Sequence, residues 1–375
     1  MRLLVTRSNA AETWRADSLR AGSRTGVTLL VYGLGHLVVD AISAGILLTL
    51  WQGEMLASPE VGTYFLLYNL LAFGVQPLLG LVVDWSRQPR TAALFGSALV
   101  AVATALFGRW PLSAVVVAGV GNAIFHLGAG SICLQLKPGH AAAPGLFVAP
   151  GVLGLFLGTY LGQAGNFVAW PFVLGLAVLG VAMTRIPIPA TVAVPPVAGW
   201  QWKWIGVALV LLLGCVSTRS LVGFSVVLPW KSGFALAVTL TVAVALGKAL
   251  GGVMADRWGW GRIAVGGLAL STSLLAFGAH SPVAAIAGMF LFNLAMPVTL
   301  VATANLLPGR PAFAFGLTAM ALELGAWTVQ AGGDSDGFGQ PWVVFGLILG
   351  AAVALYVALR TSFGRLPTLF ANVHE

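Results

Sequence analysis

Charged residues are scarce in this sequence: Asp, Glu, Lys and Arg make up 8% of the 375 residues, whereas hydrophobic residues make up 58%. A soluble domain carries about a quarter charged residues, so this chain cannot cover a water-facing surface. The mean hydropathy, +0.94, agrees with that conclusion. The sequence therefore predicts an integral membrane protein and excludes a soluble globular domain.

Cysteine is nearly absent, with only Cys133 and Cys215 in the chain. Both lie in apolar runs without metal-ligand spacing, so we interpret them as small core residues. The sequence also has no phosphate-binding Walker motif, no HExxH and no Ser/His/Asp set in a loop. We therefore expect no ATP-driven pump, no metal site, no cofactor and no enzyme, an intramembrane enzyme being the remaining enzymatic alternative.

Apolar runs of about 20 residues, the length that crosses a bilayer as a helix, recur along the chain. The predicted spans are 26–50, 61–83, 91–108, 111–135, 142–166, 168–185, 204–229, 234–255, 262–279, 282–306, 311–331 and 341–360. We expect an all-α integral membrane fold of twelve transmembrane helices in two six-helix repeats. Its parts are an N-terminal tail 1–25, a bundle 26–185, a linker 186–203, a bundle 204–360 and a tail 361–375.

Basic residues are distributed unevenly between the connecting segments. If both termini are cytoplasmic, the inside segments hold 15 of the 19 Lys and Arg residues, and the outside loops hold only Arg109 and Lys231. Because Lys and Arg favour the cytoplasmic side, we predict a multi-pass protein of the cell (inner) membrane with both termini in the cytoplasm. The net charge of +8 is then a topology signal, and nucleic acid is excluded as a partner.

The two halves repeat a loop sequence. GLVVDWSRQPR follows the second span and GVMADRWGWGR follows the eighth, displaced by 172 positions. The repeated residues are Gly80, Asp84 and Arg90 in the first copy and Gly252, Asp256 and Arg262 in the second. A second echo pairs LKPGH at 136–140 with LPGR at 307–310, and each is followed by a Gly-Leu pair. Two parallel six-helix repeats with a site at their interface are typical of transporters.

With these features the chain resembles the major facilitator superfamily, whose loop between the second and third helices carries a glycine, an aspartate and basic residues. The second copy fits this pattern, including Arg257 directly after the aspartate. The first copy has Trp85 at that position and Gln88-Pro89 further on, so we expect a weaker lock there. The resemblance implies alternating access between two bundles, commonly driven by a proton gradient, with Asp84 and Asp256 facing positive helix N-termini.

Two further stretches resemble the fosmidomycin-resistance type of efflux transporter. GHLVVDAISAGIL in the first span is similar to its His/Asp first helix, and GNAIFHLGAG in the fourth span is similar to its Asn…Phe-His run. The resemblance favours an exporter.

Six ionisable residues lie inside the predicted spans: His36, Asp40, His126, Arg219, Lys248 and Glu323. Burying a charge at the membrane centre costs about 3 kcal/mol or more, so each should face the bundle interior and have a partner. Three interpretations of Asp40 stay open: it carries the coupling proton with His36 one turn away, it is the fixed counter-ion of Arg219, or it satisfies a local polar group. Glu323 is a second candidate for the coupling proton.

The other ionisable residues also have two interpretations each. Arg219 cannot shed its charge, so it either binds or gates a substrate anion or forms a structural ion pair. Lys248 either takes part in binding or gating a substrate or extends its side chain toward the cytoplasmic interface. His126 is either a proton relay or a packing histidine. The amides that could line a cavity or bond between helices are Asn69, Gln76, Asn122 and Asn293. GVLGLFLG at 151–158 is interpreted as a helix contact surface.

Together these patterns predict a monomeric secondary transporter that moves a small solute by alternating access. Its expected partners are the solute, protons and the lipid bilayer. Proton-coupled efflux by exchange is the first interpretation. The alternatives are an uptake symporter or uniporter for a small organic anion or metal complex, and a transport-inactive membrane scaffold or assembly partner with the same fold.

Overall fold

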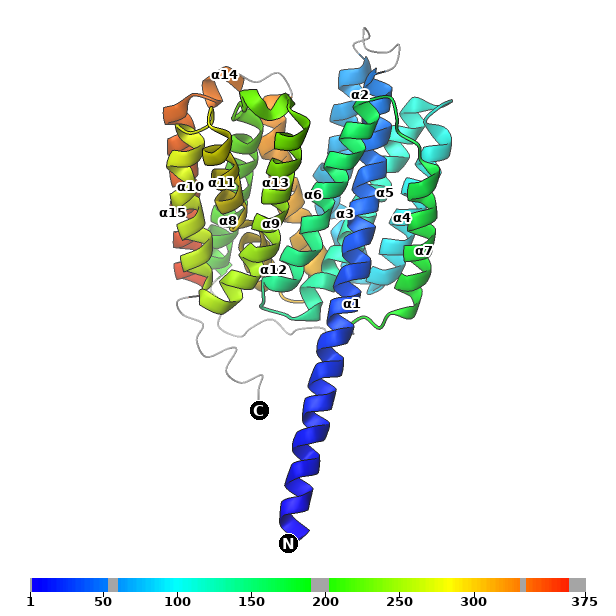
Figure 1. The fold of residues 1–375 in the computed structure, drawn as a ribbon, viewed down its shortest axis with the longest axis vertical. Helices are drawn as coiled ribbons and strands as arrows, with labels where there is room; N and C mark the ends of the chain where they lie inside the picture. Colours follow the sequence, from blue (N-terminus) through cyan, green and yellow to red (C-terminus); the bar gives the residue numbers. More distant parts are fainter. Residues whose placement is uncertain (1, 53–59, 190–201, 331–334, 364–375) are drawn as a thin grey trace.

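The computed structural model describes residues 2–52, 60–189, 202–330 and 335–363, and all of its regular elements there are helices (Figure 1). In chain order they are α1 (Arg2–Gln52), α2 (Glu60–Asn69), the π-helix η2 (Leu70–Gly74), α3 (Gln76–Ser86), α4 (Pro89–Leu106), α5 (Pro111–Leu136), α6 (Ala142–Gln163), α7 (Trp170–Arg185), α8 (Trp202–Ser225), the 3₁₀-helix η3 (Pro229–Ser232), α9 (Phe234–Trp258), the π-helix η4 (Gly261–Val265), α10 (Gly266–Ala276), α11 (Pro282–Asn293), α12 (Met296–Leu306), α13 (Pro311–Gln330), α14 (Ser335–Phe338) and α15 (Pro341–Phe363).

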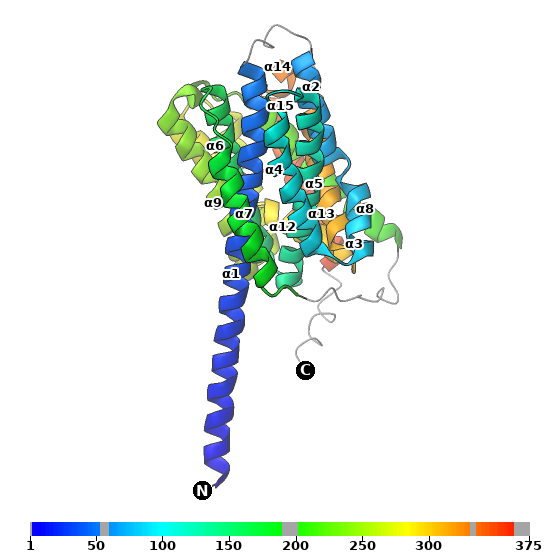
Figure 2. The same ribbon diagram turned by 90° about the vertical axis from the view of Figure 1, so that its right-hand side faces the viewer.

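The described helices make twelve passes, which confirms the predicted fold class. Three passes join shorter helices: α2, η2 and α3 form the second, η4 and α10 the ninth, and α11 and α12 the tenth. Ten stretches are long and apolar enough to cross a membrane by length and composition, and α7 and Gly261–Ala276 are shorter apolar helices. The first pass is part of a longer helix, because α1 continues through the predicted tail and extends beyond the bundle (Figures 1 and 2).

The ends of the passes follow from local chemistry. Proline stands in the first turn of α4, α5, α7, α11 and α12, where its fixed φ suits the helix and its missing N–H costs nothing. The two echoed loops turn through Gly139 and Gly309, with φ of 77° and 75°, a left-handed conformation that glycine adopts without a Cβ clash. Arg87, with φ of 55°, stands where the other half has Gly259 at 99°.

The two halves lie side by side and meet mainly along two helix pairs, α6 with α9 and α3 with α13 (Figure 1). The first helices of the halves, α1 and α8, are not among the pairs that pack extensively. Large apolar side chains such as Leu78, Val210 and Val283 are 69–80% exposed. In a bilayer these side chains face lipid, so their exposure agrees with a multi-pass membrane protein.

Candidate functional site

Two aspartates join the halves at one end of the molecule, which we call the latch end. The Asp84 carboxylate accepts hydrogen bonds from the backbone N–H groups of Ala312 (2.9 Å) and Phe313 (2.8 Å), at the start of α13. The Asp256 carboxylate accepts them from Ala141 (2.8 Å) and the next residue (2.9 Å), at the start of α6. A carboxylate at a helix N-terminus binds free donors and the positive end of the helix dipole.

The departures of the first loop copy from the family pattern do not remove its contact with the other half. Asp84 makes the same two bonds as Asp256, because the bonds need only a carboxylate and a helix N-terminus. The replacement of a basic residue by Trp85, which is 85% exposed, leaves them intact.

The repeated glycines Gly80 and Gly252 show which of the repeated segments contact each other across the two halves. A Cβ on Gly80 would lie 2.7 Å from the backbone oxygen of Ala312, and a Cβ on Gly252 would overlap that of Ala141. The motif of one half therefore packs on the echoed loop of the other half, twice. Both repeats in the sequence describe two equivalent contacts.

The other motif residues have lesser contacts. Arg90 donates to the carbonyl oxygens of Thr184 and Ile186 within the first half. Arg257 and Arg262 are exposed, and the guanidinium of Arg257 lies 5.7 Å from the centroid of the Trp258 ring.

The main polar cluster lies inside the first half, where α1 meets α5. Asp40 lies 3.1 Å from His36 Nε2 and 3.7 Å from His126 Nε2 through its two carboxylate oxygens. The two Nε2 atoms lie 2.8 Å apart, and Asn122 donates to the Asp40 carboxylate at 3.1 Å. Both imidazoles are 7% exposed and the carboxylate is 18% exposed. We call His36, Asp40 and His126 the triad.

The hydrogen bonds of the two rings determine their protonation. His36 Nδ1 lies 3.0 Å from the Phe147 carbonyl oxygen and His126 Nδ1 lies 2.8 Å from that of Asn122. A carbonyl oxygen only accepts, so both Nδ1 atoms carry hydrogen. Two neutral rings would then present facing lone pairs at the 2.8 Å contact. A hydrogen bond across the 2.8 Å contact needs a hydrogen on one of the two Nε2 atoms, and the Asp40 carboxylate lies beside both.

Glycines on α6 hold the triad in place. A Cβ on Gly151 would overlap the His36 imidazole, and Cβ atoms on Gly154 and Gly158 would overlap the α1 backbone. This confirms that the 151–158 run is a helix contact surface. The close approach brings the Phe147 carbonyl within reach of His36 Nδ1.

Of the neighbours of Asp40, Asn122 and Lys248 were predicted site residues, whereas Ser43 and Tyr68 were not. Asn122 also approaches Ser43 Oγ at 3.5 Å, and Tyr68, which hydrogen-bonds Ser43, lies close enough to Asp40 for charge to act between them. Lys248 from the second half interacts with the Asp40 charge too. Ser43 shares the α1 face with Asp40 at i+3, a signal the sequence did contain, whereas nothing in the sequence marks Tyr68.

The triad is the one His/Cys/Asp/Glu group in the described residues whose ligand atoms converge enough to hold a metal ion, all within 4.8 Å of one another. Two imidazoles on a tetrahedral zinc at Zn–N of about 2.0–2.1 Å place their nitrogens about 3.3 Å apart. The 2.8 Å separation between the Nε2 atoms is instead a hydrogen-bond length. The geometry therefore favours a proton.

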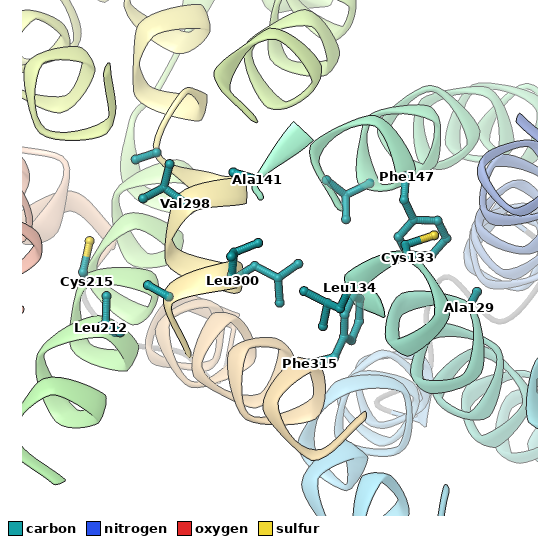
Figure 3. Close-up of a cluster of buried hydrophobic side chains, with 14 of the residues drawn as sticks. Ala129, Cys133, Leu134, Ala141, Phe147, Leu212, Cys215, Val298, Leu300 and Phe315 are labelled. Carbon is teal, nitrogen blue, oxygen red and sulfur yellow. The ribbon is translucent and has the colours of Figure 1, made fainter. Parts of the chain in front are cut away.

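An apolar layer lies between the triad and the latch end. Phe315 of α13 contacts both Phe147 and His126, with ring centroids 6.3 Å apart in each case. Figure 3 shows Leu134 of α5 and Leu300 of α12 on facing sides of the space between the halves, with Phe315 beside Leu134. All four apolar side chains are at most 7% exposed. The layer joins the two halves and separates the triad from the latch end.

The central cations of the second half are arranged differently. Arg219 is 7% exposed, donates to the Phe292 carbonyl oxygen at 3.1 Å and lies over the Phe292 ring at 5.1 Å from its centroid. Its Nε has no hydrogen-bond partner. The ion pairs in the described part of the chain are both made by Asp40 with histidines, so Arg219 is not paired with Asp40 or Glu323.

Glu323 lies apart from these groups on α13. It is 5% exposed, and its Oε1 has no hydrogen-bond partner. It forms no ion pair with another described residue. A lone carboxylate is costly to bury, so Glu323 remains a candidate for carrying a proton.

The remaining amides do not gather at one place. Asn69 donates to Gln330 of the second half at 2.7 Å, whereas Gln76 is fully buried and bonds the Ala72 carbonyl. The π-helix η2 lies between Asn69 and Gln76, so seven-residue spacing does not place them on one face. Asn293 bonds the Met289 carbonyl at 2.8 Å, where α11 ends.

A cavity of ≈ 390 Å³ is lined mostly by the second half, with Gly139 from the first half, and includes no residue of the triad. Its lining residues are Gly139, Trp260, Gly261, Asn305, Tyr356, Leu359 and Arg360. Asn305, an amide of the tenth predicted span that was also a candidate for lining a cavity, is one of them.

Neither a family model nor a curated protein matches the sequence, but solved structures do. A variant of the E. coli fucose:proton symporter FucP matches with a TM-score of 0.68 at 14% identity, over 89% of this chain and 97% of that one. A major facilitator transporter structure of FucP in the outward conformation matches with 0.66 at 12%, over 89% and 97%. The proton:xylose symporter XylE, bound to 6-bromo-6-deoxy-D-glucose, matches with 0.62 at 14%, over 91% and 96%.

The chain therefore has the major facilitator fold and is a multi-pass membrane protein. These structures give no support to the likeness to the fosmidomycin-resistance type. At identities of 12–14% the likeness shows the fold, so function has to be argued from the site.

Proposed function

We propose that the chain is a secondary transporter that moves a small solute by alternating access and couples this movement to a proton bound at the triad. The fold supports the transport mechanism, since two six-helix repeats around a central site are a transporter architecture. One observation carries the proton: the Nε2 atoms of His36 and His126 lie 2.8 Å apart while both Nδ1 atoms face carbonyl oxygens.

Proton release has a structural consequence. Without the shared proton, two lone pairs face each other beside the Asp40 carboxylate, so α1 and α5 cannot keep this geometry unchanged. The apolar layer and the two aspartate contacts close the latch end in this conformation. When the halves rock and these contacts separate, the triad becomes accessible from the latch end. Protonation of the triad and the conformation of the two halves are thereby coupled.

The mode of coupling depends on the charge of the solute. The sequence favours export in exchange for protons. Exchange requires that the solute and the proton exclude each other, as a cationic solute and a proton do when they compete for the Asp40 carboxylate. An anionic solute binds better when the triad is protonated, and this gives co-transport. Lys248, which interacts with the Asp40 charge from the second half, favours an anion. We therefore place proton co-transport first and exchange second.

The latch end is assigned to the cytoplasm in this proposal, and the membrane to a cell (inner) membrane. The support is the excess of Lys and Arg in the segments at that end of the passes. The protein is expected to act as a monomer, since each chain contains both halves of the central site.

Liposomes with a pH-sensitive dye inside test the proposal. A panel of small carboxylates, phosphonates, sugars and amines is added outside, and the change in internal pH is followed. We expect at least one member to drive proton flux, and Asp40→Asn to lose at least tenfold of it because the triad no longer has a carboxylate to balance the proton. His280→Gln, at an exposed histidine, should keep the flux.

Two results would contradict this function. Solute-driven proton flux at the normal rate in Asp40→Asn would remove the triad from coupling. No flux with any member of the panel, together with a stable stoichiometric partner on pull-down, would favour the transport-inactive scaffold.

A further inference from the structure

The second half contains one buried and one half-buried cation, Arg219 and Lys248, and neither forms an ion pair with another described residue. Arg219 on α8 and Lys248 on α9 interact electrostatically with each other, and neither has a carboxylate partner in the described residues. Arg219 keeps its charge in any environment. Ionisable groups inside a membrane protein pair with one another or line the path of a solute, and here the pairing is missing.

Comparison of the halves shows that the missing partner is particular to Arg219. Arg219 and Asp40 stand on the first helix of each half, and each bonds the fourth pass of its own half, at Phe292 and Asn122. Asp40 has His36 one turn before it, where Arg219 has Cys215. The charge of Asp40 is therefore balanced within its half, whereas that of Arg219 is not.

The tenth pass is interrupted beside Arg219. The tenth pass breaks between α11, which ends at Asn293, and α12, which begins at Met296 with Pro297 in its first turn. Helix α5 is the fourth pass and therefore the equivalent of the tenth, and it is continuous. Arg219, which is 7% exposed, donates to the Phe292 carbonyl oxygen at the break, whereas its buried Nε has no hydrogen-bond partner. A helix N-terminus at mid-pass carries partial positive charge that suits an anion.

Lys248 places this site at the interface between the halves. A Cβ on Gly145 of α6 would lie 2.7 Å from the Lys248 backbone oxygen, so α9 packs directly on the first half at this residue. Its side chain interacts with both the Arg219 and the Asp40 charges. A ligand held by both cations therefore lies beside the triad.

We propose that Arg219 and Lys248 bind an acidic group of the solute, a compact oxyanion such as carboxylate, phosphate or phosphonate. The guanidinium matches the two oxygens of such a group. The inference rests on the proposed transport function and gives it a substrate class. The proton at the triad then favours binding of the anion, since it neutralises Asp40 nearby.

Thermal unfolding of the detergent-solubilised protein tests the site without any transport. The probes are succinate, inorganic phosphate and methylphosphonate, against fucose, xylose and tetramethylammonium at equal ionic strength. We expect an anionic probe at ten times its Kd to raise Tm by about 2 °C. Lys248→Gln should weaken its binding about tenfold or more, and Arg219→Gln should abolish it. The matched controls are Lys231→Gln and Arg109→Gln, at exposed basic residues.

The outcomes separate this inference from the proposed function. A shift with the sugars or the ammonium ion and none with the anions overturns the anion site, as does an anion-induced shift that Lys248→Gln and Arg219→Gln both retain. If Arg219→Gln does not fold, Lys248→Gln decides. Solute-driven proton flux lost in Asp40→Asn, with no anion binding at all, would leave the proton triad standing and remove only the substrate class.

Discussion

The two imidazoles of the triad show how a pair of carbonyl oxygens can fix a protonation state. The Nδ1 atoms of the two rings face the carbonyl oxygens of Phe147 and Asn122, and in our proposal the two Nε2 atoms, 2.8 Å apart, share a proton. Each imidazole both donates through Nδ1 and shares the proton at Nε2, so a residue with a single hydrogen-bonding group cannot replace either ring. His36 and His126 therefore have equal importance, although only His36 lies on the helix of Asp40.

His126→Gln tests this equality. Glutamine can donate to Asp40 but cannot carry the shared proton, so we expect solute-driven proton flux to fall at least tenfold, as in His36→Gln. Selective ¹⁵N-histidine NMR should show one fewer protonated Nε2 in either variant. A normal flux in His126→Gln, with loss only in His36→Gln, would return His126 to a packing role.

The sequence predicted part of this cluster. Spacing of four residues on a helix placed His36 beside Asp40, and the structure shows that contact at 3.1 Å. It left His126 between a relay and a packing residue, because the rotation of α5 toward α1 is not encoded in a span that is apolar all round. The pairing of Asp40 with Arg219 failed for the same reason, since two charges at similar depth need not face each other.

At the scale of elements, the approach of α6 to α1 positions the triad. Gly151, Gly154 and Gly158 lie on one α6 face and let it contact the α1 backbone. Small residues at such spacing are the usual means of close helix packing in membranes. The spacing of small residues in the sequence predicted that 151–158 forms a helix contact surface, but it did not show that Gly151 contacts the His36 ring.

Gly151→Ala measures this packing. The new Cβ overlaps the His36 imidazole, so overpacking should cost about 1–3 kcal/mol and displace Nδ1 from the Phe147 carbonyl. We expect a lower Tm together with reduced proton flux. Gly214→Ala on α8 is the matched control, because its Cβ meets nothing within 4 Å and alanine favours a helix. Equal Tm values for the two variants would exclude the packing role of Gly151.

Breaks within passes were beyond sequence prediction. The predicted spans 61–83 and 282–306 correspond to single passes, yet η2 interrupts the first and residues 294–295 interrupt the second. Hydropathy averages over side chains and does not register a local change of backbone hydrogen bonding. For this reason Asn69 and Gln76 were expected on one face, whereas the structure separates them.

At the scale of the whole molecule, the internal repeat has a mechanical meaning. Each aspartate motif belongs to the second pass of one half and binds the start of the fifth pass, α6 or α13, of the other half. A twofold relation between the halves thus produces two equivalent contacts from one sequence pattern. The repeat could be read from the sequence, but the conclusion that its two echoes touch each other required the fold.

Breaking either contact should open the latch end. Asp84→Asn and Asp256→Asn each weaken two charge-assisted hydrogen bonds, which are worth about 1.5–3 kcal/mol each, so the closed population should fall by tenfold or more. Cys133, buried and drawn with the apolar layer in Figure 3, reports this opening through its alkylation rate in a Cys215→Ser background. We expect both variants to raise that rate to a similar extent, and Trp85→Arg to leave it unchanged because Trp85 is exposed. An effect of Asp256→Asn alone would mean that the first motif copy does not hold the halves together, despite its two bonds to α13.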